Sequence, residues 1–196
     1  NGSVWVSQSL SPAYSMSMEV FTSSSTWTAP AGVTRAKVTV TGGGASGSTG
    51  ANANAGGTAG STAIKVLTVV PATVYTVTIG AGGAAVLIAT TSGNAGGTSS
   101  ISGSGITTVS APGGPAGGSG SASPAGLACS GHDISIPGGS AGAYVANATA
   151  STGGASYFSG NSPLSTAGNG YGAGAGGVYN STVSYAGADG VVVIEY

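Results

Sequence analysis

The amino-acid sequence predicts an all-β protein with extensive irregular glycine-rich structure and no significant α-helix. Glycine supplies 39 of the 196 residues, against about 7% in an average protein. Valine, isoleucine and threonine recur in short runs typical of strands. Between residues 80 and 190, glycine and β-branched residues are spaced so densely that no run of about ten residues would form a stable helix.

Composition narrows the class of protein further. The chain has only three Lys and Arg residues and four Asp and Glu residues, and its mean hydropathy is +0.32. Disordered segments usually combine high charge with few β-branched residues, so we expect a folded chain. The absence of a basic patch argues against nucleic-acid binding. The longest apolar runs, residues 66–70 and 191–194, are too short to cross a bilayer.

The expected strands follow in chain order. Residues 16–22 alternate weakly in polarity and predict either an edge strand or a lead-in from an upstream shaft, so we separate residues 1–25 from a glycine-rich domain over 26–196. Residues 36–41 predict a strand with Ala36, Val38 and Val40 on one face.

Three further strands complete a small predicted sheet. Residues 62–70 and 73–80 bracket the corner Pro71-Ala72 and could pair as a hairpin. Residues 190–196 form a continuous β-branched run, which is typical of a central strand covered on both faces.

The glycine-rich segments between these strands carry a repeat of three. Glycine or another tiny residue returns at every third position in runs that include Gly44, Gly47, Gly50, Ala53 and Gly56, then Gly57 and Gly60, then Gly114, Gly117, Gly120, Ser123 and Gly126. Three residues per turn is the repeat of a polyproline-type helix, whose backbone groups must find partners on neighbouring strands. Two interpretations remain open: packed strands of the polyglycine II type, or a sheet interrupted by long glycine-rich loops.

Three sequence blocks carry a resemblance to a known family. They are TWTAPAGVTRAKVTVTGGG at residues 26–44, PATVYTVTIGAGG at 71–83 and GADGVVVIEY at 187–196. In this order, with the glycine-rich spacer between them, they resemble the glycine-rich domain at the C-terminal ends of bacteriophage tail fibres. The chain is also similar to the T-even-type tip adhesins, although alanine and serine here often replace glycine of their denser glycine runs.

The resemblance implies a function and a location. A tail-fibre tip of the virion would bind a receptor on the bacterial surface, either an outer-membrane protein or a polysaccharide, without inserting into the membrane. It also implies association with other tail-fibre chains, as a homotrimer through the parent fibre. In the T-even-type adhesins, packed polyglycine II helices carry variable receptor-binding loops.

Aromatic residues in the glycine-rich connections are the candidate receptor contacts. Rings in small-residue loops supply contact area at a low entropy cost, and they could equally cap the ends of a glycine bundle. The candidates are Tyr144, Tyr157, Phe158, Tyr171, Tyr179 and Tyr185.

No catalytic residue, metal site or cofactor is predicted. His132 and Asp133 are adjacent and Ser130 is close by, but no Gly-x-Ser-x-Gly elbow lies between a strand and a helix, and a lone histidine supplies too few ligands for a metal. Cys129 is the only cysteine and is expected to be a small buried hydrophobe. We therefore expect a non-enzymatic protein. A self-assembling filament module and an ice-binding protein are the alternatives.

Overall fold

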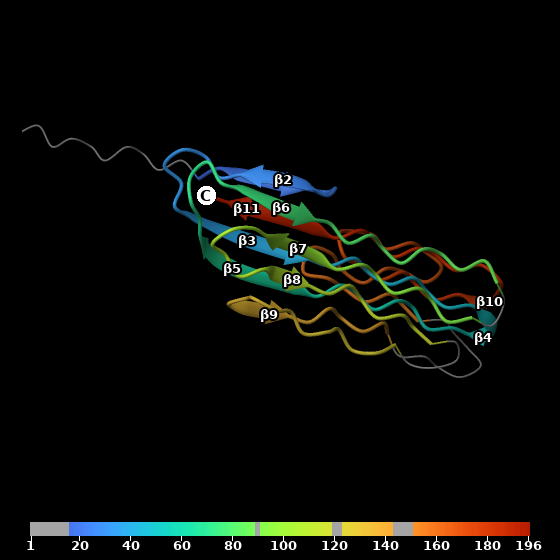
Figure 1. Cartoon of the computed structure of the whole chain (residues 1–196). Helices are drawn as coiled ribbons and strands as arrows, with labels where there is room; N and C mark the ends of the chain where they lie inside the picture. The colour runs from blue at the N-terminus through green and yellow to red at the C-terminus, as the bar shows by residue number, and fades with distance from the viewer. Residues whose placement is uncertain (1–15, 89–90, 119–122, 143–150) are drawn as a thin grey trace, which may run out of the picture.

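The computed structural model describes residues 16–88, 91–118, 123–142 and 151–196. Over these residues the molecule is elongated, with its two main β-sheets at one end and glycine-rich segments that run from the sheets to the other end (Figure 1). No helix occurs among the described residues. The all-β prediction is therefore confirmed.

The two main sheets are antiparallel. Sheet A has the order β1 (Met18–Phe21), β11 (Val191–Glu195), β3 (Arg35–Thr41), β5 (Thr62–Thr68) and β9 (Ile134–Ile136). Sheet B has the order β2 (Ser25–Thr28), β6 (Val74–Thr78), β7 (Ser99–Ser102) and β8 (Val109–Ala111). At the far end of the molecule, β4 (Gly50–Ala53) pairs with β10 (Tyr179–Ser181) in a two-stranded ribbon (Figure 1).

All five predicted strands are present, but the expected hairpin is wrong. Strand β5 pairs with β3 and β9, whereas β6 pairs with β2 and β7. The corner at Pro71-Ala72 carries the chain from sheet A to sheet B. Ala72 has a φ of 61°, and the backbone N–H of Val70 donates to the Tyr75 hydroxyl at 3.1 Å. The alternating pattern therefore predicted the strands but not their partners.

Large side chains fill the space between the two sheets. Trp27 and Tyr75 are buried, and their ring centroids lie 5.6 Å apart. Glu19 of β1 accepts hydrogen bonds from Trp27 Nε1 at 3.1 Å and from the Tyr196 hydroxyl at 2.7 Å. These bonds join β1 to β2 of sheet B and to the residue that follows β11. The aliphatic core includes Val38, Val40, Leu67, Val77, Ile101, Val109, Val192 and Ile194.

Beyond the sheets, the chain crosses repeatedly between the sheet end and the far end, and we call each crossing a pass. The pass over residues 42–49 donates its N–H groups in rotation to three neighbours. Residues 42, 45 and 48 donate to carbonyls 61, 58 and 55, residues 43, 46 and 49 donate to carbonyls 97, 94 and 91, and residues 44 and 47 donate to carbonyls 188 and 185. A step of three along each neighbour is the pattern of a helix with three residues per turn. This pass is therefore a polyglycine II-type strand.

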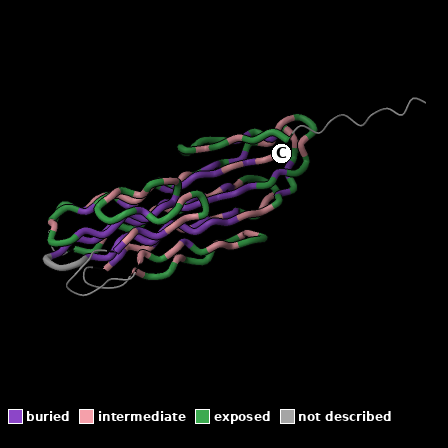
Figure 2. The backbone as a smooth tube through the Cα atoms, turned by 180° about the vertical axis from the view of Figure 1, so that it is seen from behind, coloured by how far each residue is buried: buried purple, intermediate pink, exposed green. Residues whose placement is uncertain are grey.

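Six passes surround this central one. The three that accept its N–H groups return toward the sheets, into β5, β7 and β11. Three others run outward alongside it, and Gly83, Gly114 and Ala175 of these passes donate to its carbonyls. Residues 42–49 are consequently buried along their whole length, and Figure 2 shows buried chain continuing from the sheets along the middle of the molecule.

The passes pack backbone against backbone. A Cβ atom added at Gly57 would lie 2.0 Å from the carbonyl oxygen of Ala45, and one added at Gly174 would lie 1.9 Å from the carbonyl oxygen of Gly57. Buried hydroxyls fill the remaining positions and are satisfied: Ser46 Oγ accepts from the Asn94 N–H at 2.7 Å. Among the described residues, no buried side-chain nitrogen or oxygen lacks a partner. Glycine and serine thus replace the apolar core found between the sheets.

Candidate functional site

The structure separates the described candidate aromatic residues into three places. Tyr144 lies outside the described residues. Tyr157, Phe158 and Tyr171 belong to the loop over residues 156–172, close to sheet A. Tyr179 lies in β10 at the far end, and Tyr185 lies on the pass that returns from β10 to β11. The six predicted contacts therefore do not form a single described cluster.

The loop over residues 156–172 holds two rings against each other. Tyr157 and Phe158 are in edge-to-face contact, with centroids 5.0 Å apart. Ser156 Oγ accepts from the Phe158 N–H at 3.2 Å and donates to the Tyr171 carbonyl at 2.5 Å, which closes the loop. A Cβ atom added at Gly172 would lie 2.6 Å from Thr41 Cγ2. The loop therefore rests on the outward side of β3, where this strand enters the bundle.

The far end of the molecule carries exposed apolar side chains. Leu87 is 72% exposed and Ile88 is 69% exposed, and Tyr179 and Val183 are also exposed. Hydrogen bonds bring their segments together: the Ser184 N–H donates to the Val86 carbonyl at 2.9 Å, and Thr49 Oγ1, next to β4, donates to the Ile88 carbonyl at 2.5 Å. We call Leu87, Ile88, Tyr179 and Val183 the apolar tip.

Tyr185 lies further from this end. Its carbonyl accepts the N–H of Gly47 at 3.1 Å, so its backbone is part of the bundle, while the residue is 40% exposed. Of the predicted aromatic residues that the structure describes, only Tyr179 is part of the apolar tip.

Sequence reasoning did not select Leu87, Ile88 or Val183. A signal was available: residues 86–88 form an apolar Val-Leu-Ile run between two glycine-rich passes. Because the chain reverses between these passes, a run at this position reaches the end of the bundle. Val86 is buried, and the two residues that follow it are exposed.

Charged side chains are confined to the other half of the molecule. No Asp, Glu, Lys or Arg occurs in residues 66–132 or 134–188. Lys37 of β3 pairs with Glu195 of β11 at 2.8 Å, and Lys65 of β5 pairs with Asp133 at 2.9 Å. Asp189 lies just before β11, and its Oδ1 accepts from the Gly82 N–H at 2.7 Å. A partner at the apolar tip would therefore meet no charged side chain there.

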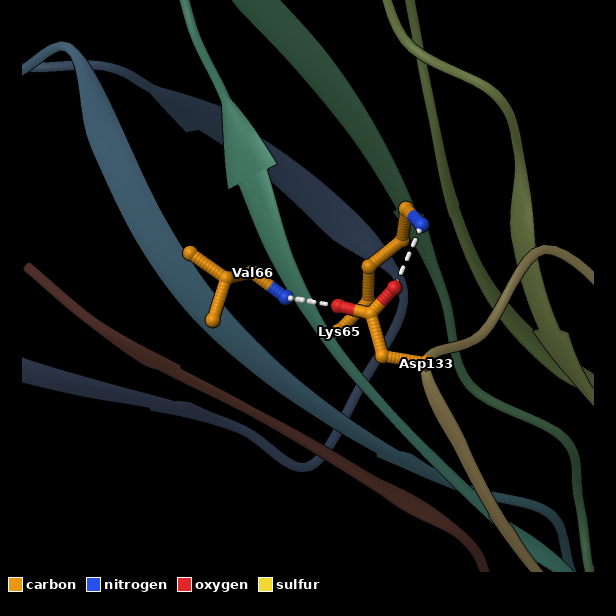
Figure 3. Close-up of polar contacts among 3 residues, drawn as sticks. All are labelled: Lys65, Val66 and Asp133. Atoms are coloured by element: carbon orange, nitrogen blue, oxygen red, sulfur yellow. Dashed lines mark hydrogen bonds and ion pairs between the residues drawn. The ribbon is translucent and has the colours of Figure 1, made fainter.

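The His132-Asp133 pair lies at the edge of sheet A. Asp133 Oδ2 accepts from the Val66 N–H at 3.0 Å, and Oδ1 accepts from Lys65 Nζ at 2.9 Å (Figure 3). These bonds, that of Val66 first, lower the pKa of the Asp133 carboxyl below its usual value. The backbone of Ser130 pairs with that of Ser110. Asp133 thus extends the hydrogen bonding of β5 past the start of β9, because its carboxylate accepts the N–H of Val66 in place of a backbone carbonyl.

The described part of the chain contains no group of three or more His, Cys, Asp or Glu residues that could hold a metal ion. Cys129 is only partly buried, packs against the core between the sheets and donates its backbone N–H to Ser135 Oγ at 3.3 Å. Burial raises the pKa of its thiol. The same residues include no helix long and apolar enough to cross a membrane.

The fold and the tip define a class of protein: a two-sheet β-structure extended by a bundle of polyglycine II-type strands. Comparison with known families supports the glycine-rich character of this domain. The chain belongs to a family of glycine-rich domains, whose model matches residues 19–196. No curated protein matches the chain.

Proposed function

We propose that this chain is a distal tail-fibre domain that binds a receptor on the bacterial surface during phage adsorption. The observation that carries the proposal is the apolar tip. Leu87, Ile88, Tyr179 and Val183 are all exposed at one end of the bundle. Clustered exposed apolar side chains mark interaction sites more often than scattered ones do.

The positions of Ser17 and Tyr196 in the fold support this role. Ser17 and Tyr196 exchange two backbone hydrogen bonds, at 2.8 and 3.0 Å. Both lie at the sheet end, opposite the apolar tip (Figure 1). A shaft joined at this end would leave the apolar tip pointing away from the virion. Under this proposal the domain acts with other tail-fibre chains as a homotrimer.

The chemistry of the apolar tip defines the kind of contact expected. Its side chains offer apolar area and one phenol, and no charge lies near it in the sequence. Binding would therefore depend on apolar burial and on hydrogen bonds with a protein loop or a neutral part of a polysaccharide. Such contacts are weakened little by salt, unlike contacts between exposed charges.

Cell binding by the purified chain tests the proposal. Labelled chain is applied to bacterial strains that differ in outer-membrane proteins and surface polysaccharides, and bound label is measured by flow cytometry. We expect the Leu87→Ser, Ile88→Ser double variant to lose binding roughly tenfold or more, because two exposed aliphatic side chains contribute about 1 kcal/mol each when buried.

The matched control is the double variant Val70→Ser, Val74→Ser. These two residues are 58% and 56% exposed and lie at the sheet end. The control should bind cells as the unaltered chain does, and both variants should have the melting temperature of the unaltered chain. The proposal fails if no strain binds the unaltered chain, or if the tip variant binds as well as the control.

A further inference from the structure

The two outward faces of the β-sheets differ sharply in polarity. On sheet B, registered neighbours form hydroxyl rows, Thr26–Thr76–Ser102 and Thr78–Ser100–Ser110. Val74 of β6 is the exposed apolar exception. A sheet with one solvated face is expected to look like this, with apolar residues inward and polar residues outward.

Sheet A breaks the rule. A single row of registered neighbours crosses all five strands in the order Val20, Val193, Thr39, Ile64 and Ile134. Val20 is 49% exposed and Ile134 is 54% exposed, while Val193 and Ile64 are half-buried. The adjacent row adds Met18 and Val66, both exposed. We call the outward residues Met18, Val20, Ile64, Val66, Ile134 and Val193 the apolar face.

Neighbouring residues frame the apolar face, whose centre is the least exposed part: Thr39, in the middle of the row, is only 4% exposed. Lys37 and Glu195 lie between Met18 and Val66 and neutralise each other. On the side toward the bundle, the loop over residues 156–172 covers Thr41. Arg35 lies one row further out, opposite Thr68. The face is therefore an apolar strip with a polar rim, which is the usual anatomy of a protein interface.

From this pattern we infer that the apolar face packs against the same face of a second copy of this chain. The charges favour this occupant. Lys37 and Glu195 on the face are already paired with each other, so a highly charged partner would form no new ion pair there. A copy brings an equally neutral strip, and the net charge of −1 gives two copies little reason to repel. Two such sheets can pack face to face about 10 Å apart, with their side chains interdigitated.

The size of the apolar face sets the expected strength. Four strand spacings of about 4.8 Å make each row about 19 Å wide, and the two rows lie about 7 Å apart along the strands. The strip therefore offers much less than the about 800 Å² that each partner buries in a standard stable interface. Association should therefore be weak, with a dissociation constant in the range of about 1–100 μM, and would strengthen when copies are held together in a fibre. The inference is independent of the proposed receptor contact, because the apolar tip lies at the other end.

Sedimentation equilibrium of the full chain between about 1 and 300 μM, which spans that range, tests the inference. We expect reversible association to dimers, because both copies use the same face. The double variant Val20→Thr, Ile134→Thr retains β-branched side chains and should weaken association at least about tenfold. The matched control Val70→Thr, Val74→Thr should stay within about twofold of the unaltered chain, and so should the tip variant Leu87→Ser, Ile88→Ser.

Three results would overturn the inference: a monomer throughout the concentration range, association that the double variant leaves unchanged, or equal weakening by the control. If the double variant fails to fold, Val20→Thr alone replaces it, with an expected weakening of about threefold. Because cell binding and association are read from different variants, failure of one proposal does not imply failure of the other.

Discussion

The sheet end and the bundle end of this molecule are both closely packed, but by different means. Between the sheets, large side chains such as Trp27, Tyr75 and Ile101 are fully buried. In the central pass the corresponding buried residues are glycine, alanine, serine and threonine, and neighbouring backbones touch directly. The sheet end removes apolar side chains from water, whereas the bundle end pairs its backbone N–H groups with the carbonyls of three neighbouring passes.

This difference predicts opposite sensitivities to mutation. A core of large side chains loses stability mainly when a side chain is shortened, because a cavity remains. A bundle held by backbone hydrogen bonds has few side-chain atoms to lose, and each bond contributes only about 0.5–1.5 kcal/mol net. It should instead fail when an atom is added, because the obstructing atoms belong to a backbone that is fixed on several sides.

The largest effect is expected from Gly57→Ala. The new Cβ would lie 2.0 Å from the Ala45 carbonyl oxygen and 2.5 Å from its carbon, so whole passes must separate. We expect a loss of more than about 4 kcal/mol in the free energy of unfolding, which is exceptional for one added carbon. Chemical denaturation would measure it.

Gly160→Ala is the matched control, because nothing lies within 4 Å of a Cβ atom there and its φ is not positive. That variant should be unchanged or more stable by up to about 1 kcal/mol, since alanine restricts the unfolded chain. Equal losses in both variants would contradict the packing described for the bundle.

The complementary change at the sheet end is Ile101→Ala. Ile101 is fully buried among the core residues of both sheets. Removing three carbons should cost about 2–5 kcal/mol, according to how far the surroundings collapse. The reversed change in the bundle, Ala45→Gly, should cost only about 1 kcal/mol, because little side chain is lost. Thermal melting of both variants checks the contrast, and a larger loss for Ala45→Gly would refute it.

The same contrast explains which parts of the fold the sequence predicted. Side-chain packing leaves an alternating pattern, so the strands of the sheets were recognisable. Their pairing was not, because Pro71-Ala72 joins two sheets through contacts of Tyr75 that no local pattern encodes. In the bundle, glycine is not confined to every third position, because residues on all three sides of the central pass contact neighbouring passes. Gly42, Gly43 and Gly44 each face a different backbone, so consecutive glycines are required.

The candidate site was predicted only in part, for a related physical reason. Aromatic residues in loops were selected because they are large, and Tyr179 does lie at the apolar tip. Leu87 and Ile88 were missed because a short aliphatic run usually belongs to a core. Here the core between passes has no room for such side chains, and the run emerges at the end of the bundle. The hydrogen bond from Ser184 places it beside Val183, and the hydrogen bond from Thr49 places it beside β4.

The smallest predicted effect is the change of stability with pH. It should be confined to the sheet end, because the charged residues lie there. The pKa of Asp133 is lowered in the folded state, first by the Val66 N–H and then by Lys65. Its stabilising contribution is therefore fully present above the unfolded pKa of about 3.9 and is lost as pH falls through the lower folded value. Because Asp133 is exposed, the effect should be small.

Asp133→Asn isolates this contribution, since asparagine can still accept from Val66 but carries no charge. We expect the variant to melt slightly below the unaltered chain near neutral pH, and the gap to close between about pH 4 and pH 2, where the aspartate of the unaltered chain becomes protonated. Hydrogen exchange should show faster opening at Val66 in the variant and unchanged protection at Gly57 in the bundle. A gap that persists at about pH 2 would mean that Asp133 acts through its shape rather than its charge.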